Sequence, residues 1–288
     1  MITVRPKQIP YPIRLSIHRL SDLKAHERII PSELDSLAQD MNRTGFQRDP
    51  ILIDSKSHVV LDGMHRRAAL ERLRMKYALC AEYDYFSDEV ILQRWLRYMI
   101  APSKSLLTSI RALFHLKPCS SSREAILYVD SGRSAMGVLS AENSMVSEER
   151  KTPVSSTRIV DVYERINEFD ALCKSSGVEI GFVGEGEKTK LYSSKSVYVL
   201  YPVPIGKSQI IAFAKKGHVL PFKTTRHIVP VRPMGVYFPL ENLKNSNLAQ
   251  CNEILQKIVA LSTVKLERRN VWYEGRKYNE PLAVFRGN

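Results

Sequence analysis

The sequence of 288 residues has little of what marks secreted, membrane or zinc-binding proteins. Its four cysteines lie far apart, with no CxxC pair and no Cys/His spacing, which excludes a disulfide scaffold and a zinc ribbon. Apolar runs are short, such as 210–214, whereas a membrane-spanning helix needs about 20 apolar residues. Residues 1–12 are too proline-rich and polar for a secretory signal. We therefore expect a cytoplasmic protein that makes no membrane contact.

Acidic residues are also fewer than basic ones: 30 Asp and Glu stand against 43 Lys and Arg, a formal net charge of +13. Such an excess favours a polyanionic partner, such as a nucleotide or a nucleic acid. The excess is dispersed, however, with a net charge of +3 in residues 1–100, +7 in 101–245 and +3 in 246–288. The charge alone therefore assigns no partner, and it also fits an ordinary basic surface.

Residues 1–100 show the hydrophobic pattern of a compact α+β domain. The expected elements are a strand and turn (13–23), a helix (32–44), a hairpin (50–61), a helix (68–74), a strand (77–85) and a helix (88–98). Ser32 can cap the first of these helices and Gly45 can end it.

The rest of the chain divides into two parts. Residues 101–158 are rich in Ser and Thr, and we expect an insertion or linker of uncertain structure there. Residues 159–288 show helix and strand patterns again, including a helix at 248–261, and we expect a C-terminal α/β domain. The fold expected overall is α+β, with a catalytic cleft between the two domains.

The most informative segment is the strand–turn–helix at 59–73. Gly63 allows the backbone to approach a phosphate closely, and the free N–H groups of the first helical turn favour an anion. His65 and Arg66 add charge-assisted donors there. Asp62 can either cap the turn or hold a Mg²⁺ ion that bridges phosphates, and the sequence leaves both open.

A second dense set of donors lies between Pro221 and Pro230. Five successive side chains, Lys223-Thr224-Thr225-Arg226-His227, carry hydrogen-bonding groups. A solvated loop can have this composition, but so can a site for a phosphate or a carboxylate. We predict an anion-binding loop.

Together these residues resemble a known family. Asp62-Gly63-Met64-His65-Arg66-Arg67 is similar to the GxxR box of the ParB/sulfiredoxin superfold, whose members bind nucleotide phosphates at this helix start. Leu23-Lys24-Ala25-His26-Glu27, the same box and Lys223-Thr224-Thr225-Arg226-His227 occur in the order typical of the free L-serine kinases. The resemblance covers about 15–98 and 215–245, and it implies a ParB/sulfiredoxin-like nucleotide-binding domain in residues 1–100.

The resemblance implies a kinase that converts free L-serine to O-phospho-L-serine with ADP or ATP, in serine and cysteine metabolism. The resemblance implies that Glu27 is the catalytic base. The implied nucleotide- and phosphate-binding residues are Asp62, Gly63, Met64, His65, Arg66, Lys223 and Thr224, and Asp62 is the candidate Mg²⁺ ligand. The implied serine-binding residues are Trp95, Thr225, Arg226 and His227. From the sequence alone, Glu27 can equally be a surface carboxylate, and Trp95 a core residue.

The sequence departs from the family in one motif position, where Met64 replaces the usual first histidine and leaves one phosphate contact in doubt. Two alternatives remain open: a ParB-like nucleotide-gated DNA-binding protein, and a kinase of the same fold acting on another small hydroxylated metabolite. The sequence shows no recognisable helix-turn-helix, which disfavours the DNA-binding alternative, so nucleic acid is not expected as a partner. We expect a monomer or a homodimer.

Overall fold

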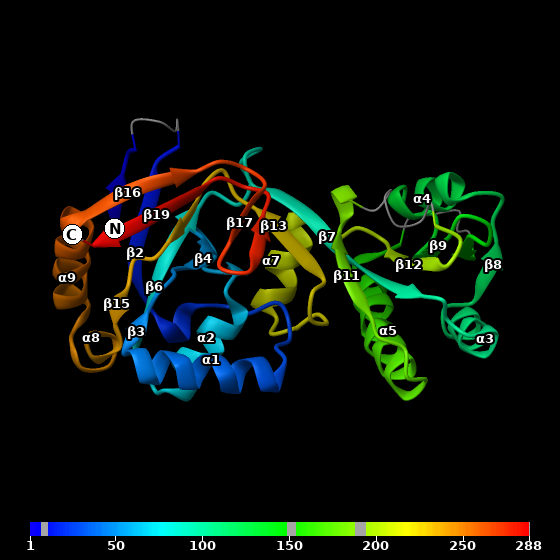
Figure 1. Ribbon diagram of the computed structural model, residues 1–288, viewed down its shortest axis with the longest axis horizontal. Coiled ribbons are helices and arrows are strands. Elements are labelled where there is room, and N and C mark those ends of the chain that lie inside the picture. The colour runs from blue at the N-terminus through cyan, green and yellow to red at the C-terminus, as the bar shows by residue number, and fades with distance from the viewer. Residues whose placement is uncertain (7–10, 149–153, 188–193, 288) are drawn as a thin grey trace. The chain divides into compact units, whose positions relative to one another are not determined.

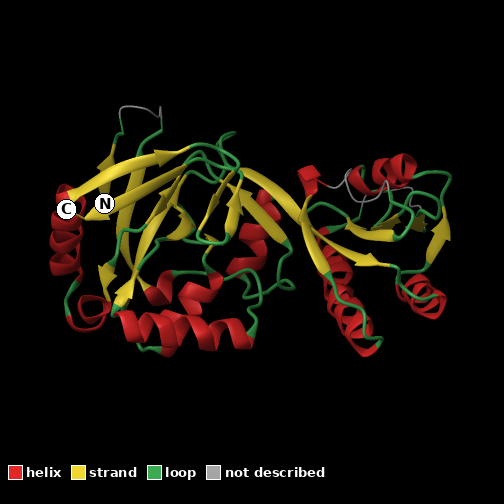
Figure 2. Cartoon of the chain, viewed as in Figure 1, coloured by secondary structure: helices red, strands yellow, loops and turns green. Residues whose placement is uncertain are grey.

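The computed structural model describes residues 1–6, 11–148, 154–187 and 194–287 (Figures 1 and 2). The chain forms two compact units: the first unit comprises residues 1–91, 211–219 and 227–288, and the second unit comprises 92–210 and 220–226. These ranges differ from the boundaries expected at 100 and 158, because residues 227–288 return to the first unit.

The first unit is built on a five-stranded sheet with the order β1-β2-β6-β4-β5. Its strands are β1 (Ile2–Val4), β2 (Ile13–Arg19), β6 (Tyr77–Tyr83), β4 (Ile51–Asp54) and β5 (Val60–Asp62). β4 and β5 form the expected antiparallel hairpin, and β4 runs parallel to the central strand β6. Every residue of β4 is buried, as in a strand covered on both faces.

Helices α1 (Pro31–Thr44) and α2 (Met64–Arg72) pack side by side in this unit (Figure 1). The expected cap at Ser32 is wrong, because Pro31 already occupies the first helical turn and Ile30 is the N-cap residue. Proline suits that position, since its missing N–H has no partner within the helix. Gly45 ends α1 as expected, in the left-handed conformation with φ 77°.

The C-terminal part of the chain completes the first unit. It contributes two small sheets, β14-β19-β16 and β17-β18, and the strand β15 that pairs with β3. The elements are β3 (Phe46–Gln47), β14 (Arg232–Met234), β15 (Phe238–Pro239), α8 (Leu240–Asn245), α9 (Leu248–Leu261), β16 (Ser262–Glu267), β17 (Val271–Tyr273), β18 (Arg276–Tyr278) and β19 (Leu282–Gly287), together with the short η1 (Leu20–Asp22). The expected helix at 248–261 is confirmed by α9, which starts with a capping box at Asn247.

The second unit contains an antiparallel sheet in which β11-β7-β12-β9-β10-β8 are neighbours. Its elements are β7 (Ile91–Ile100), α3 (Lys104–Leu113), β8 (Leu116–Pro118), α4 (Ser122–Asp130), β9 (Met136–Leu139), β10 (Met145–Ser147), α5 (Ser156–Ser175), β11 (Gly181–Gly184), η2 (Glu185–Glu187) and β12 (Val197–Pro202). The described part of 101–158 therefore supplies three strands, two complete helices and the start of α5, and its residues 149–153 lie outside the described residues. Two further elements, α7 (Lys207–Lys215) and β13 (Thr225–Ile228), include residues of both units.

The helix expected at 88–98 is wrong, because residues 91–100 form the strand β7. The apolar spacing in this segment imitates a helix because two arginines, Arg94 and Arg97, are buried on the strand. β11 and β12 pair with its two edges and take up its backbone hydrogen bonds. Pairing from distant parts of the chain thus overrides the local pattern.

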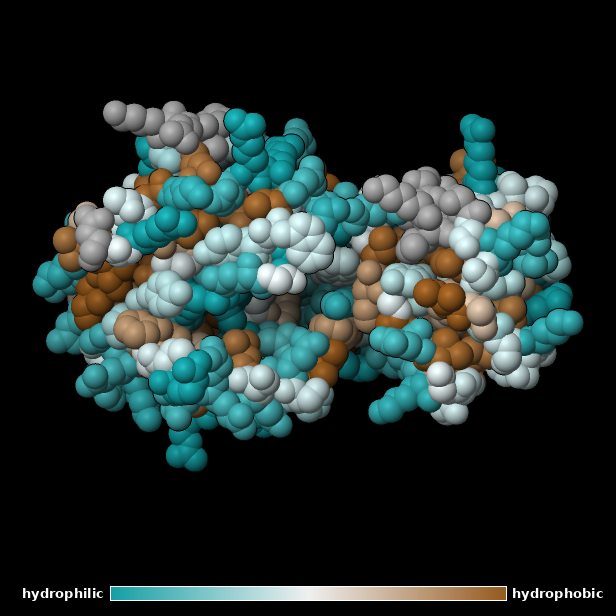
Figure 3. All heavy atoms as spheres, viewed as in Figure 1, coloured by the Kyte–Doolittle hydropathy of each residue, from teal (hydrophilic) through white to brown (hydrophobic). Residues whose placement is uncertain are grey.

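The surface mixes hydrophilic and apolar side chains on the face shown in Figure 3. Among the described residues, none of the helices has the length and apolar character needed to cross a membrane.

Candidate active site

The first candidate group lies at the start of α2, where β5 ends. Gly63 is the N-cap residue and has φ 103°, a left-handed conformation that strongly favours glycine. The guanidinium of Arg66 lies directly against it: a Cβ atom at position 63 would be 3.0 Å from both Nε and Nη2 of Arg66. Glycine is therefore required here both for the turn and for the arginine above it.

Arg66 keeps donors available for an anion. Its Nη atoms lie 3.8 Å from Oδ2 of Asp49 and 3.7 Å from Oδ2 of Asp62, which is longer than a hydrogen bond. Its Nε is buried and makes no hydrogen bond to the described residues. A phosphate at the start of α2 would supply the acceptor oxygens that this guanidinium lacks.

Asp62 is held by arginines and does not cap α2, whose first turn has no side-chain cap. Arg232 binds Asp62 and also donates from Nε to Oε1 of Glu280 at 2.6 Å. Burial alone would raise the pKa of Asp62, but Arg232, Arg276 and Arg66 hold it well below the usual range. The residues therefore do not fit a Mg²⁺ ion held by Asp62, and the described part of the chain has no group of three or more His, Cys, Asp and Glu that could hold a metal.

Helix α2 also fixes the segment that carries Glu27. Nε of Arg67 donates to the carbonyl of Leu23 at 2.9 Å, and the N–H of Ile30 donates to Nε2 of His65 at 3.0 Å. These two contacts lie on either side of Glu27 in the sequence. The helix that presents Gly63 and Arg66 thus holds both ends of the Glu27 segment.

His26, the neighbour of Glu27 in the chain, packs against a second buried histidine, His227. Nε2 of His26 lies 3.8 Å from Oε1 of Glu27, and the rings of His26 and His227 stand edge to face with centroids 5.6 Å apart. Burial, and then the neighbouring His227, lower the pKa of His26 to about 3, so His26 is neutral at physiological pH. A neutral His26 does not cancel the negative charge of Glu27. The hydroxyl of Tyr85 is hydrogen-bonded to Nε2 of His227 at 2.8 Å.

The second candidate group lies in the second unit, on β7 and the segment 220–226. Trp95 sits on the strand β7, and the guanidinium of Arg226 lies 4.5 Å from the centroid of its indole ring. Nζ of Lys223 lies 4.4 Å from the ring centroid of Phe182 and 5.2 Å from that of Phe222. Two cations are therefore held over aromatic faces, an arrangement that keeps their donors at fixed positions.

An ion pair between a buried arginine and a partly exposed aspartate holds the backbone beneath Lys223. Arg97 binds both carboxylate oxygens of Asp170, at 2.7 and 2.9 Å, and donates to the carbonyl of Phe222 at 2.8 Å. Lys223 has φ 50°, which is uncommon for a residue with a side chain and must be maintained by its surroundings. Thr224 is fully inside: its hydroxyl donates to the carbonyl of Pro221 at 2.7 Å, so that hydroxyl supports the turn.

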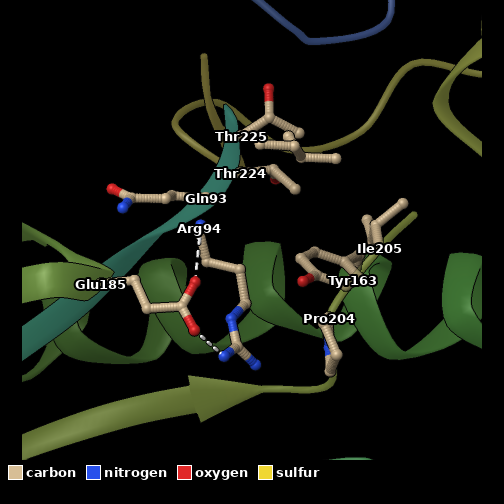
Figure 4. A pocket seen from close by; sticks show the side chains of 9 residues that line it. Gln93, Arg94, Tyr163, Glu185, Pro204, Ile205, Thr224 and Thr225 are labelled. Carbon is tan, nitrogen blue, oxygen red and sulfur yellow. Dashed lines mark hydrogen bonds and ion pairs between the residues drawn. The ribbon is translucent and has the colours of Figure 1, made fainter. Parts of the chain in front are cut away.

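A small pocket of about 30 Å³ adjoins this group (Figure 4). Its wall includes Gln93, Arg94, Tyr163, Glu185, Pro204, Ile205, Thr224 and Thr225. Figure 4 shows the ion pair of Arg94 and Glu185 along one side, with the N–H of Arg94 donating to Oε2 of Glu185 at 3.1 Å. The pocket has room for about one water molecule or a very small group.

The structure thus gathers the sequence-predicted residues into two groups. Glu27, Asp62, Gly63, Met64, His65, Arg66 and His227 lie in the first unit, and Trp95, Lys223, Thr224, Thr225 and Arg226 lie in the second. The sequence did not single out Tyr85, Arg97, Asp170 or Phe182 for a role. Arg97 and Asp170 are 73 positions apart, so no local pattern could join them.

No family model matches the chain, but searches against known proteins find similar ones. It is 26% identical to an ATP-dependent L-serine kinase of Staphylothermus marinus over 257 residues, which cover 84% of this chain and 95% of that protein. It is 21% identical to the ADP-dependent L-serine kinase SerK of Thermococcus kodakarensis over 230 residues, 78% of this chain and 90% of that one.

A solved structure of a free serine kinase, a glutamate-to-glutamine variant in complex with AMP, has the same fold. It superposes with a TM-score of 0.64 at 22% identity, over 80% of this chain and 93% of that chain. The α+β fold and the resemblance to the free L-serine kinases are thereby confirmed, and both extend over most of the chain.

Proposed function

We propose that this protein is a kinase that transfers the terminal phosphoryl group of ADP or ATP to the hydroxyl of free L-serine, giving O-phospho-L-serine. Proteins with this activity in their names align with 78–84% of the chain, and the fold is theirs. The four cysteines are free thiols, which suits a reducing compartment, and we propose a cytoplasmic location.

One observation carries the proposal: α2 joins a candidate phosphate site at its start to the segment that carries the proposed general base, Glu27. Gly63 and Arg66 form the first, and the contacts of His65 and Arg67 hold the Glu27 segment from both ends. Phosphoryl transfer depends mainly on positioning and on neutralising phosphate charge, so a base whose segment is tied to the helix of the proposed phosphate site meets its main requirement.

In the proposed reaction, the nucleotide phosphates bind at the start of α2 and accept hydrogen bonds from Arg66 and from the helix N–H groups. Glu27 accepts the proton of the serine hydroxyl as that oxygen attacks the terminal phosphorus. The bond from phosphorus to the leaving nucleotide breaks, and AMP leaves when ADP is the donor, or ADP when ATP is the donor. Neutral His26 places no positive charge beside Glu27, which favours its role as the base.

Mg²⁺ enters the proposal with the nucleotide, as part of the magnesium–nucleotide substrate. Arginines already compensate the charge of Asp62, so Asp62 is not proposed as a ligand of the ion. Trp95, Thr225 and Arg226 are proposed to bind serine together with Lys223, whose donors are fixed over Phe182 and Phe222.

The test is production of O-phosphoserine, read by mass spectrometry, from L-serine with ADP and with ATP. Glu27→Gln should lower kcat by about 10² to 10⁴, the usual effect of removing a general base, while nucleotide affinity is retained. Asp22→Asn is the matched control, because Asp22 is an exposed acid in the same part of the chain and lies in η1.

Two results would contradict the proposal. One is the absence of O-phosphoserine from the wild-type protein with both nucleotides. The other is a Glu27→Gln variant that turns over at the wild-type rate. Phosphorylation of another hydroxylated metabolite in place of serine would retain the chemistry and replace the acceptor.

A further inference from the structure

Strands β7 and β11 present one continuous face beneath the cations of the second unit. Their register pairs Gly184 with Trp95 and Phe182 with Arg97. Side chains alternate between the two faces of a strand, so these four positions lie on the same face. Lys223 and Arg226 lie over the aromatic rings of this face.

Gly184 is the only member of this set of four without a side chain, and Arg226 occupies the space above it. A Cβ atom at position 184 would lie 1.7 Å from Nη1 of Arg226 and 2.9 Å from Cζ. Both distances are far below van der Waals contact. The observed position of the Arg226 guanidinium, 4.5 Å from the centroid of the Trp95 indole, therefore requires glycine at position 184.

Backbone conformation does not explain this glycine. Gly184 belongs to the regular strand β11 and is absent from the positive-φ glycines, among which Gly63 is found. An alanine at position 184 would be allowed by the backbone. It would meet only the far end of a flexible arginine side chain, which can move away at low cost. The alanine would therefore change the direction of the Arg226 side chain and have little effect on the stability of the strand.

We propose that Gly184 is a positioning residue for the acceptor, which holds Arg226 in place to bind the α-carboxylate of the amino acid. The inference rests on the proposed function. Trp95 covers one face of the planar guanidinium and Gly184 admits its Nη1 end, so the orientation of its donor edge is fixed. A guanidinium held in this way matches the two oxygens of a carboxylate.

The test compares Gly184→Ala with Gly186→Ala. A Cβ atom at Gly186 would meet only Nε2 of Gln93, at the ordinary distance of 3.7 Å, so this variant is the matched control. Gly184→Ala should raise the KM for L-serine about 10- to 100-fold, the effect of losing hydrogen bonds to a charged group. The KM for the nucleotide and the melting temperature should stay within error, and Gly186→Ala should behave as wild type.

A second acceptor identifies the group that Arg226 binds. 2-Aminoethanol has the hydroxyl and the amine of serine but no carboxylate, so the wild-type protein should use it poorly. Gly184→Ala should leave kcat/KM for 2-aminoethanol unchanged and so reduce the preference for serine. A variant with an unchanged KM for serine would overturn the inference. A raised KM for the nucleotide alone would overturn the carboxylate assignment, because Arg226 would then bind phosphate.

The Arg226→Ala background shows whether Gly184 acts through Arg226. There the added methyl group has room, so Gly184→Ala should have no further effect on the KM for serine. If Gly184→Ala alone does not fold, the double variant should fold, and its failure to fold would contradict the inference. Absence of activity in wild-type protein would contradict the proposed function instead. Fluorescence of Trp95 in Trp272→Phe protein, titrated with serine, then decides whether Arg226 still binds the amino acid.

Discussion

Both units of the protein contain an arginine whose guanidinium lies on a glycine, but they hold it differently. In the first unit Arg66 lies on Gly63, three positions earlier on the same turn, and faces the carboxylates of Asp49 and Asp62. In the second unit Arg226 lies on Gly184, which comes from another part of the chain, and faces the indole of Trp95.

The difference indicates which kind of ligand suits each arginine. Arg66 has long ion pairs that a doubly charged phosphate can outcompete, which suits a group that binds and releases a nucleotide. Trp95 and the missing side chain at Gly184 define the position of the Arg226 guanidinium, which suits a fixed binding point for the amino acid. The comparison predicts that the first arginine acts on nucleotide binding and the second on the amino acid.

The largest effect is expected where the ion pair of Arg97 and Asp170 supports the second group. Asp170→Ala should lower the free energy of unfolding by about 3 kcal/mol, because it leaves the buried guanidinium of Arg97 without its carboxylate. The measurement is urea unfolding followed by Trp95 fluorescence in Trp272→Phe protein. Glu148→Ala, which breaks the exposed pair with Lys117, is the control and should not change the midpoint. Equal effects of the two variants would mean that Arg97 does not anchor the segment.

Alanine variants of the two arginines test directly whether Arg66 binds the nucleotide and Arg226 binds the amino acid. Arg66→Ala should weaken nucleotide binding about 10- to 100-fold, because charge-assisted hydrogen bonds to phosphate are lost, and should leave the KM for serine unchanged. Arg226→Ala should have the opposite pattern. Isothermal titration with ADP and steady-state kinetics in serine measure the two effects. A variant that changes both parameters equally would show that the two groups do not act separately.

The same contrast explains what the sequence could and could not predict. The Gly63–Arg66 group is contiguous, and the left-handed glycine and the arginine one helical turn later form a local pattern that predicts an anion site. The hairpin before it and the helix after it were predicted for the same reason, since their patterns are local. Resemblance to a family added the role of Glu27, which its charged surroundings alone did not indicate.

The second group was only half predicted. Lys223–Arg226 is visible as a run of donors, but its supports, Gly184, Phe182 and Asp170, are distant in sequence. Residues 88–98 were predicted as a helix, whereas 91–100 form β7, on which Arg94 and Arg97 are buried with acidic partners. Burial of a charged side chain depends on a partner supplied by another segment, and a single sequence does not show which one.

Acid should destabilise the first unit through His26. Its pKa is lowered to about 3 in the folded protein, so between pH 6.5 and pH 3 the unfolded chain binds a proton that the folded chain does not. Stability should therefore fall as pH decreases, by about 2 kcal/mol between pH 6.5 and pH 5 from this group. Urea midpoints at the two pH values measure it. His26→Gln should reduce the loss, and the exposed histidine variant His115→Gln should retain it.

The smallest effect tests whether the buried pair of His26 and His227 positions the base. Tyr85→Phe removes the hydroxyl that is hydrogen-bonded to Nε2 of His227 and should cost about 1 kcal/mol of stability. Tyr83→Phe is a close match, since it also removes a buried tyrosine hydroxyl, which donates to the carbonyl of Val231 at 2.7 Å. If the Tyr85–His227 contact orients the surroundings of Glu27, only Tyr85→Phe should also lower kcat, severalfold, with both KM values unchanged. Equal kcat values in the two variants would reduce Tyr85 to a packing role and leave Glu27 positioned by α2 alone.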